Sequence, residues 1–264
     1  MIVLSLPAVA DAWPAGMVVA VALFGLAIGS FLNVVIARVP AGRSLVHPGS
    51  ACPGCSAPLA WHDNIPVLSY LVLRGRCRTC AMRISWRYPI VEATTAALFV
   101  LAYVALGPSA DFVIALVLLP ALVAMTAIDL QHQMIPDVIT LPGIPVGFLM
   151  NIALGRMSWV ESVIGILIGG GLFLVIILVS RGGMGGGDLK LGAMLGAFLG
   201  WKALLFGLFV AIVLGGVIGV ALLATGVRGR KDPIPFGPFL AAGGAMALVW
   251  GERAFSWWVR GFVG

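Results

Sequence analysis

Asp129 and Asp188 are the two side chains of this sequence best suited to acid–base chemistry beside a membrane. Asp129 ends an apolar run, and Asp188 follows Gly185, Gly186 and Gly187 between two long apolar segments. An ionised Asp at membrane depth is unfavourable, so an acid kept there is a candidate functional residue. Two carboxylates brought together can work as an aspartic hydrolase, because one is protonated while the other activates water. The sequence therefore predicts that these two acids meet.

The glycines at 185–187 predict an unusual backbone around Asp188. Glycine adopts positive φ without steric cost and lets another backbone approach closely, so we expect this stretch to admit an extended substrate. Lys190 follows on the same stretch and is a candidate substrate contact. The alternative, a merely flexible connector, leaves Asp188 unexplained.

Three further side chains near the acidic pair have competing interpretations. His132 stands three positions after Asp129, so a metal pair is an alternative, although a metal site needs more ligands than this face offers. Glu92 follows Arg87 at the expected start of a helix, where a carboxylate complements the helix dipole and can pair with Arg87; a role at the substrate is the alternative. Asp137 follows Pro136 and is expected to cap a helix.

Four cysteines form two CxxC pairs, Cys52 with Cys55 and Cys77 with Cys80, separated by 21 residues. Two such pairs can surround a tetrahedral Zn²⁺, and a four-cysteine site is structural because it leaves no open position for water. Two disulfides are the alternative, but a loop facing the reducing cytoplasm keeps its thiols reduced. His62, between the pairs, is either a further ligand, a substrate contact or an ordinary loop residue.

The composition is that of a polytopic membrane protein. Of 264 residues, 61% are hydrophobic and 10% are charged, against about 45–50% and about 25% in soluble domains. We therefore expect an all-α membrane protein with about seven or eight transmembrane helices and one zinc-ribbon-like loop domain. The expected spans are 17–37, 89–107, 112–129, 138–155, 162–180, 203–225 and 236–251, with 189–201 as a shorter eighth. The expected divisions are 1–37, 38–88 and 89–264.

The cations predict the orientation of the chain. With the N-terminus outside, 12 of the 16 Lys and Arg residues fall on the cytoplasmic side and 4 on the other, as the positive-inside rule requires. This orientation puts the cysteine loop and both candidate acids at the cytoplasmic face. It also makes anionic lipids the natural partners of the basic residues, and it makes nucleic acid a poor partner for so hydrophobic a chain.

Several motifs in order resemble those of the type IV prepilin peptidases, also known as leader peptidase/N-methyltransferases. They are GSFLNVV from Gly29, both CxxC pairs, WHDNIPVLSYLVLRGRCRTC from Trp61, ISWRYPIVE from Ile84, IDLQHQMIPD from Ile128, GGGDLKLGAMLGAFLG from Gly185 and PFGPFLAAGG from Pro235. One departure is visible, since many relatives carry an acid two positions after the first catalytic Asp, where this chain has Gln131.

The resemblance implies an activity, a substrate and a cofactor. By it, Asp129 and Asp188 are the catalytic acids of an endopeptidase in the bacterial inner membrane. The substrate is a prepilin or pseudopilin whose short basic leader is cut after a Gly on the cytoplasmic side. The resemblance also implies methylation of the new N-terminus from S-adenosylmethionine, which we expect near the cysteine loop and the end of the first helix. The sequence shows no glycine-rich nucleotide fingerprint of its own.

Two other classes of protein fit part of the pattern. In an ion- or proton-coupled transporter the acids would form a relay and the glycine run a broken helix, but such a protein predicts two related halves. A zinc-stabilised assembly scaffold would need no chemistry at the acids.

Overall fold

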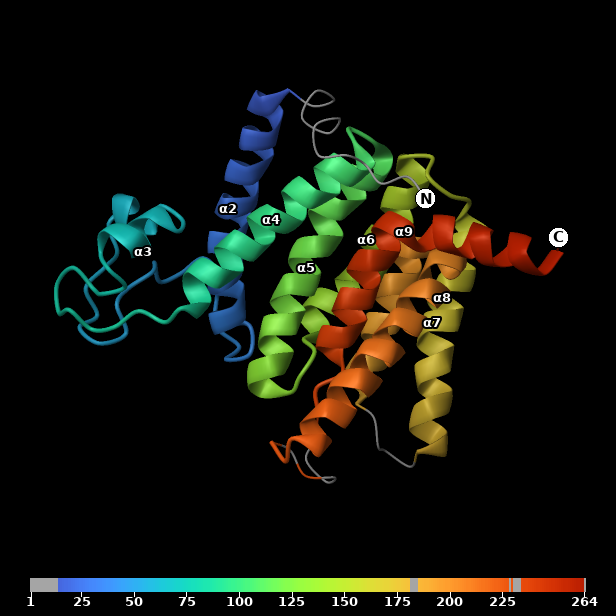
Figure 1. The fold of residues 1–264 in the computed structure, drawn as a ribbon. Helices are drawn as coiled ribbons and strands as arrows, with labels where there is room; N and C mark the ends of the chain where they lie inside the picture. The colour runs from blue at the N-terminus through green and yellow to red at the C-terminus, as the bar shows by residue number, and fades with distance from the viewer. Residues whose placement is uncertain (1–13, 181–184, 228, 230–233, 264) are drawn as a thin grey trace. The chain divides into compact units, whose positions relative to one another are not determined.

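The computed structural model describes residues 14–180, 185–227, 229 and 234–263, and these are helical apart from loops (Figure 1). They contain no extended strand, only two isolated β-bridges. This confirms the all-α prediction. In chain order the elements are α2 (Ala15–Arg38), the 3-10 turn η1 (Trp61–Asn64), α3 (Leu68–Val72), α4 (Arg87–Leu106), α5 (Ala110–His132), α6 (Asp137–Ala153), α7 (Trp159–Val179), α8 (Gly186–Ala224) and α9 (Gly237–Val263).

Five of the described helices, α2, α4, α5, α7 and α8, are long and apolar enough to cross a membrane. The apolar helix α6 is shorter, at 17 residues. Each of the seven expected spans falls on one of the helices. The expected short segment 189–201 and the expected span 203–225 both fall within α8, and a non-helical residue, Gly200, lies near their boundary.

The chain folds as two compact units, Met1–Phe112 and Val113–Gly264. In the first unit α2 crosses α4 (Figure 1) at two glycines one helical turn apart. A Cβ added at Gly25 would lie 2.6 Å from the Cα of Ala96, and one at Gly29 would lie 2.6 Å from the Cα of Glu92. Small residues spaced by four therefore let these two backbones meet, as in many membrane helix pairs. The three-part division expected from the sequence stays a prediction.

In the second unit α8 packs against α6, α7 and α9 (Figure 1). The contact with α7 is a glycine seam, since a Cβ at Gly169 would collide with the carbonyl of Gly192 and one at Gly165 with that of Gly196. In lipid the hydrophobic effect does not drive helices together, so their association depends on van der Waals packing. Such packing is strongest where small residues let the two backbones approach closely. The position of α8 is therefore fixed closely by α7.

A break at Gly200 interrupts α8, where the backbone has φ 71° and ψ 169°. Such a break frees carbonyl groups that water cannot satisfy at membrane depth. Neighbouring helices supply the donors: the Asn151 amide bonds the carbonyls of Ala197 and Phe198 at 2.8 and 3.1 Å, and the Ser162 hydroxyl bonds Ala197 at 2.9 Å. The break is thus built into the packing of three helices.

Gly200→Ala is expected to lower the free energy of unfolding by about 1–3 kcal/mol, because this region of φ and ψ is essentially restricted to glycine. The added methyl would also lie 3.0 Å from the Met157 sulfur. Thermal unfolding in detergent measures the loss. Gly171→Ala in α7 is the matched control, since its methyl meets no atom within 4 Å. Equal midpoints for the two variants would contradict this account.

Candidate functional site

Asp129 and Asp188 belong to the same unit and lie close enough for their carboxylates to interact electrostatically. Asp129 is in the last turn of α5 and is 5% exposed; Asp188 is in the first turn of α8 and is 9% exposed. One oxygen of Asp129, Oδ2, accepts a hydrogen bond from the N–H of Gly237 at 3.0 Å. The end of α5, the start of α8 and the start of α9 therefore converge on this acidic pair.

Ile135 lies between the segments that carry the acids. A Cβ at Gly187 would come within 2.9 Å of the Ile135 Cβ, and one at Gly237 within 3.3 Å of its Cδ1 and 2.5 Å of the Asp129 Oδ2. Both positions therefore need a residue without a side chain. Ile135 therefore packs an apolar side chain against the first turns of α8 and α9, next to the residues that contact the acids.

The glycines at 185–187 do not adopt the positive φ that we expected, and that prediction is wrong. Gly185 is the extended N-cap residue of α8, with φ −78° and ψ 147°, and Gly186 and Gly187 have helical geometry. The reason is that α8 begins here, so two of the three glycines are ordinary first-turn residues. Residues 181–184, which directly precede these glycines, lie outside the described residues.

Of the two preceding glycines 185 and 186, Gly185 is the one that lies beside the Asp188 carboxylate among the described residues. A Cβ at Gly186 would meet no atom within 4 Å, and one at Gly185 would lie 4.0 Å from the Asp188 Oδ2. Gly185 therefore places no side chain beside this carboxylate. Access of an extended substrate along this stretch stays a prediction.

Lys190 forms an ion pair with Asp137, with its ammonium 2.7 Å from both carboxylate oxygens. Asp137 is the first residue of α6, and Pro136 holds the N-cap position, so the expected capping role of Asp137 is wrong. Its carboxylate instead joins the start of α6 to the first turn of α8. A contact between Lys190 and the substrate stays a prediction.

His132 does not complete a metal site with Asp129. Among the described residues, the grouping of three or more metal-binding side chains is the cysteine cluster alone, and it includes neither Asp129 nor His132. A metal bound by Asp129 and His132 would therefore have no third side-chain ligand among the described residues.

Glu92 lies in the second turn of α4, and not in the first turn as expected, because α4 begins at Arg87. Its side chain is buried, at 8% exposure, and its Oε2 accepts the N–H of Val67 at 2.7 Å. The predicted dipole role is therefore wrong, since a carboxylate acts on a helix dipole only in the first turn. Glu92 instead fixes a loop residue of the cysteine domain.

The two CxxC pairs have the same backbone geometry. The Cys52 N–H donates to the Ala57 carbonyl at 2.9 Å and the Cys77 N–H donates to the Met82 carbonyl at 2.8 Å, each across a six-residue turn. The fifth residue of each turn adopts positive φ, 56° at Ser56 and 57° at Ala81. An isolated β-bridge closes each turn. The two CxxC pairs thus form two equivalent turns, and each turn contributes two sulfurs to one cluster.

The four sulfurs of Cys52, Cys55, Cys77 and Cys80 lie within 4.8 Å of one another. The Cys52 and Cys80 sulfurs are 3.7 Å apart, and tetrahedral Zn–S bonds of about 2.3 Å require a separation of about 3.8 Å. N–H groups of Cys80 and Thr79 lower the pKa of the Cys77 thiol to about 6. The Met82 N–H also lowers the pKa of the Cys80 thiol. Desolvation and the neighbouring thiols outweigh it and raise the pKa of Cys80 to about 11. The cluster stabilises one thiolate and resists further negative charge, so its geometry and its electrostatics both suit a dication.

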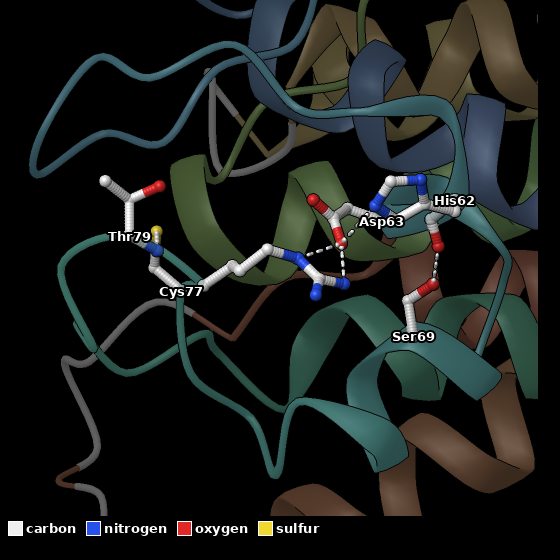
Figure 2. Close-up of polar contacts among 6 residues, drawn as sticks. His62, Asp63, Ser69, Cys77 and Thr79 are labelled. Carbon is white, nitrogen blue, oxygen red and sulfur yellow. Dashed lines mark hydrogen bonds and ion pairs between the residues drawn. The ribbon is translucent and has the colours of Figure 1, made fainter.

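Polar contacts hold the rest of the cysteine loop (Figure 2). Arg78 donates from Nε and Nη2 to Asp63 at 3.0 and 2.6 Å, and this hydrogen bond holds the pKa of Asp63 below its usual value. The Ser69 hydroxyl donates to the His62 carbonyl at 2.7 Å. The His62 ring lies 3.8 Å from the Asp63 carboxylate and is not part of the sulfur cluster.

Sequence reasoning missed Gly237 and Ile135. Both lie within motifs that carry the resemblance, PFGPFLAAGG and IDLQHQMIPD, but neither has a side chain with chemistry of its own. The available signal at position 237 was a glycine directly before a proline, at the start of an apolar run. A contact between residues 108 positions apart is not readable from such a signal.

These features define a polytopic helical membrane protein with a buried acidic pair and a four-cysteine module in separate units. The family profile described as "Bacterial Peptidase A24 N-terminal domain" matches residues 23–106, and that of the "Type IV leader peptidase family" matches residues 116–220. The chain belongs to the type IV leader peptidase family.

Curated relatives match nearly the whole chain. A protein of Aeromonas hydrophila is 40% identical over 91% of this chain and 93% of its own length. A protein of Burkholderia pseudomallei (strain 1026b) is 42% identical over 91% of this chain and 88% of its own length. A protein of Bacillus subtilis (strain 168) is 34% identical over 90% of this chain and 96% of its own length. Each bears the name "Prepilin leader peptidase/N-methyltransferase". No solved structure matches the fold.

Gly187→Ala is expected to destabilise the protein by about 1–3 kcal/mol, because the methyl would press against Ile135 in a packed site. Gly186→Ala is its matched control one residue away. There the methyl meets nothing and Ala favours the helix, so stability is expected to hold or rise. Thermal unfolding of both variants in one detergent gives the comparison. The packing argument fails if Gly187→Ala unfolds at or above the temperature of Gly186→Ala.

Proposed function

We propose that this protein cleaves the short basic leader from type IV prepilins or pseudopilins and methylates the new N-terminus. The observation that carries the peptidase proposal is the buried pair of Asp129 and Asp188, whose carboxylates lie within electrostatic range of each other. The names of relatives that match over about nine-tenths of the chain support both activities. The work would take place at the cytoplasmic face of a bacterial inner membrane.

Hydrolysis at the acidic pair follows from the chemistry of two neighbouring carboxyls. In a water-poor site two like charges do not both persist, so the pair shares one proton. The ionised carboxylate takes a proton from a water molecule while the oxygen of that water attacks the scissile carbonyl carbon. The protonated carboxyl gives its proton to the carbonyl oxygen. The tetrahedral intermediate then collapses, the C–N bond breaks, and the leaving amine takes a proton from the pair.

Asp129 is the better held of the two acids. The Gly237 N–H occupies its Oδ2, which fixes the carboxylate and leaves the other oxygen for water or substrate. Gly185 places no side chain beside the Asp188 carboxylate. This difference supports a site in which Asp129 is oriented by the protein and Asp188 meets the substrate backbone.

The cysteine cluster is proposed to bind one Zn²⁺ through Cys52, Cys55, Cys77 and Cys80. A loop between 38 and 88 has little apolar core, and a metal would supply the missing folding energy. The described part of this loop has one short helix, α3, and the turn η1. All four ligands are thiols, so the site is structural and leaves no position for a reacting water.

S-adenosylmethionine is the methyl donor that we propose. It would supply an electrophilic methyl group to the new amine. The first unit contains a cavity of about 1260 Å³ lined by Ser30, Asn33, Asp63 and Glu92 among others. The buried Asn33 Oδ1 has no hydrogen-bond partner there, which is a fit for a ligand that carries N–H groups. Anionic lipids remain the predicted partners of the exposed arginines.

Asp129→Asn and Asp188→Asn should each lower cleavage of a reconstituted prepilin by at least about 100-fold, because each removes a proton-transfer group. Unfolding temperature should change little, since Asn keeps the volume of Asp. Asp111→Asn, at the opposite end of α5, is the matched control and should cleave normally. The proposal is wrong if either active-site variant cleaves at the wild-type rate, and a wild-type protein that never cleaves would favour a transporter or a scaffold.

Purified protein is expected to contain one Zn²⁺ per chain by elemental mass spectrometry. Cys52→Ser combined with Cys80→Ser should lose the metal and make the loop at 38–88 sensitive to protease. His62→Ala should retain the metal, because His62 lies outside the sulfur cluster. Metal-free protein with no titratable thiols would instead identify the disulfide alternative.

A further inference from the structure

The cavity of the first unit contains a buried polar group that the peptidase chemistry does not use. Glu92 of α4 and Asn33 of α2 both line it, at 8% and 4% exposure. The cavity volume of about 1260 Å³ exceeds the range of about 300–1,000 Å³ typical of small-molecule sites. There is room for a ligand and for the end of a peptide.

Glu92 is held in place by a loop of the cysteine domain. Its Oε2 accepts the Val67 N–H at 2.7 Å, and the side chains of Ser30 and Asn33 line the same cavity. Val67 adopts φ 59° and ψ −48°, in a γ-turn closed by a bond from Leu68 N–H to the Pro66 carbonyl at 2.5 Å. This conformation is rare and strained, above all for a β-branched residue. The loop therefore accepts strain in order to bring an N–H to this carboxylate.

Asn33 adds an acceptor that the fold leaves unused. Its Nδ2 donates to the Tyr88 carbonyl at 3.1 Å, which identifies the nitrogen and so assigns Oδ1. Oδ1 is buried and has no hydrogen-bond partner among the residues that the structure describes. A buried acceptor without a donor is unfavourable and rare in native structures. A ligand that donates hydrogen bonds would resolve it.

We propose that Glu92 and Asn33 bind a primary ammonium group inside this cavity. One negative charge and one neutral acceptor match a positive group with three N–H donors. A Mg²⁺ or Ca²⁺ ion is a poorer match, because it requires about six oxygen ligands or many retained waters. The arrangement is a charge-assisted hydrogen-bond site on two packed helices, close to the cysteine cluster, since Cys52 and Cys77 also line the cavity.

This inference rests on the proposed function, which offers two sources of such a group. One is the new N-terminus of the cleaved substrate, the amine that receives the methyl. The other is the amino-acid end of the methyl donor. Both present an ammonium that the same two side chains would recognise, and binding measurements can distinguish them.

Glu92→Gln is the informative variant. Gln keeps an oxygen that accepts the Val67 N–H, so the loop geometry survives while the charge is lost. The probes for the donor are S-adenosylhomocysteine and 5′-methylthioadenosine, which lacks the amino-acid end. The probes for the acceptor are a mature pilin N-terminal peptide with a free amine and the same peptide acetylated. Binding to the full-length protein in detergent is measured by calorimetry, with leader cleavage assayed in parallel.

The expected result is a loss of affinity of about 10-fold or more for one ammonium-bearing probe and none for its ammonium-free partner. Loss confined to S-adenosylhomocysteine assigns the site to the donor, and loss confined to the free peptide assigns it to the acceptor. Cleavage should continue in Glu92→Gln. Glu161→Gln, which removes the same charge from α7 in the second unit, should bind all four probes as the wild type does.

The inference is overturned if Glu92→Gln binds all four probes unchanged, or if it weakens the ammonium-free probes equally, which indicates a structural role. It is also overturned if the wild type shows no preference for ammonium-bearing probes. Failure of the proposed function has a different signature, since a wild-type protein that does not cleave prepilin refutes the peptidase whatever the probes show.

Discussion

The hydrogen bond from the Gly237 N–H to the Asp129 carboxylate illustrates the constraint on which the rest of this structure depends. At membrane depth a polar group has no water to bind, so the protein must supply its partner. A backbone N–H is an economical donor, because it adds neither bulk nor charge. It reaches the carboxylate only because position 237 has no side chain, since a Cβ there would lie 2.5 Å from the same oxygen.

The same constraint explains the break in α8. The carbonyls released near Gly200 are bonded by side chains of α6 and α7, so a feature that weakens an isolated helix becomes a contact among three. Asn151 and Ser162 are both fully buried. The Asn151 amide and the Ser162 hydroxyl both donate hydrogen bonds to carbonyls next to the break. Their role is to keep an irregular backbone compatible with lipid, which is why polar residues occur inside otherwise apolar helices.

The sequence was informative where the chemistry is in the side chains themselves. It predicted the helical membrane fold, and it singled out the four cysteines, which the structure gathers into one cluster. It failed where packing between distant segments decides. The φ values at 185–187 were mispredicted because conformational freedom was inferred from glycine alone, whereas α8 begins there. The bond between Glu92 and Val67 was missed because neither residue type indicates a partner 25 positions away.

The position of Asp188 follows from helix packing more than from the glycine run that precedes it. Gly192 and Gly196 meet the backbone of α7 directly, and Lys190 ties the first turn of α8 to Asp137 at the start of α6. Asp188 stands one turn before this seam, in the first turn of α8. A site that needs a carboxylate placed to within a fraction of an ångström gains more from such an element than from a loop. Gly185, at the N-cap of α8, adds no side chain beside the Asp188 carboxylate.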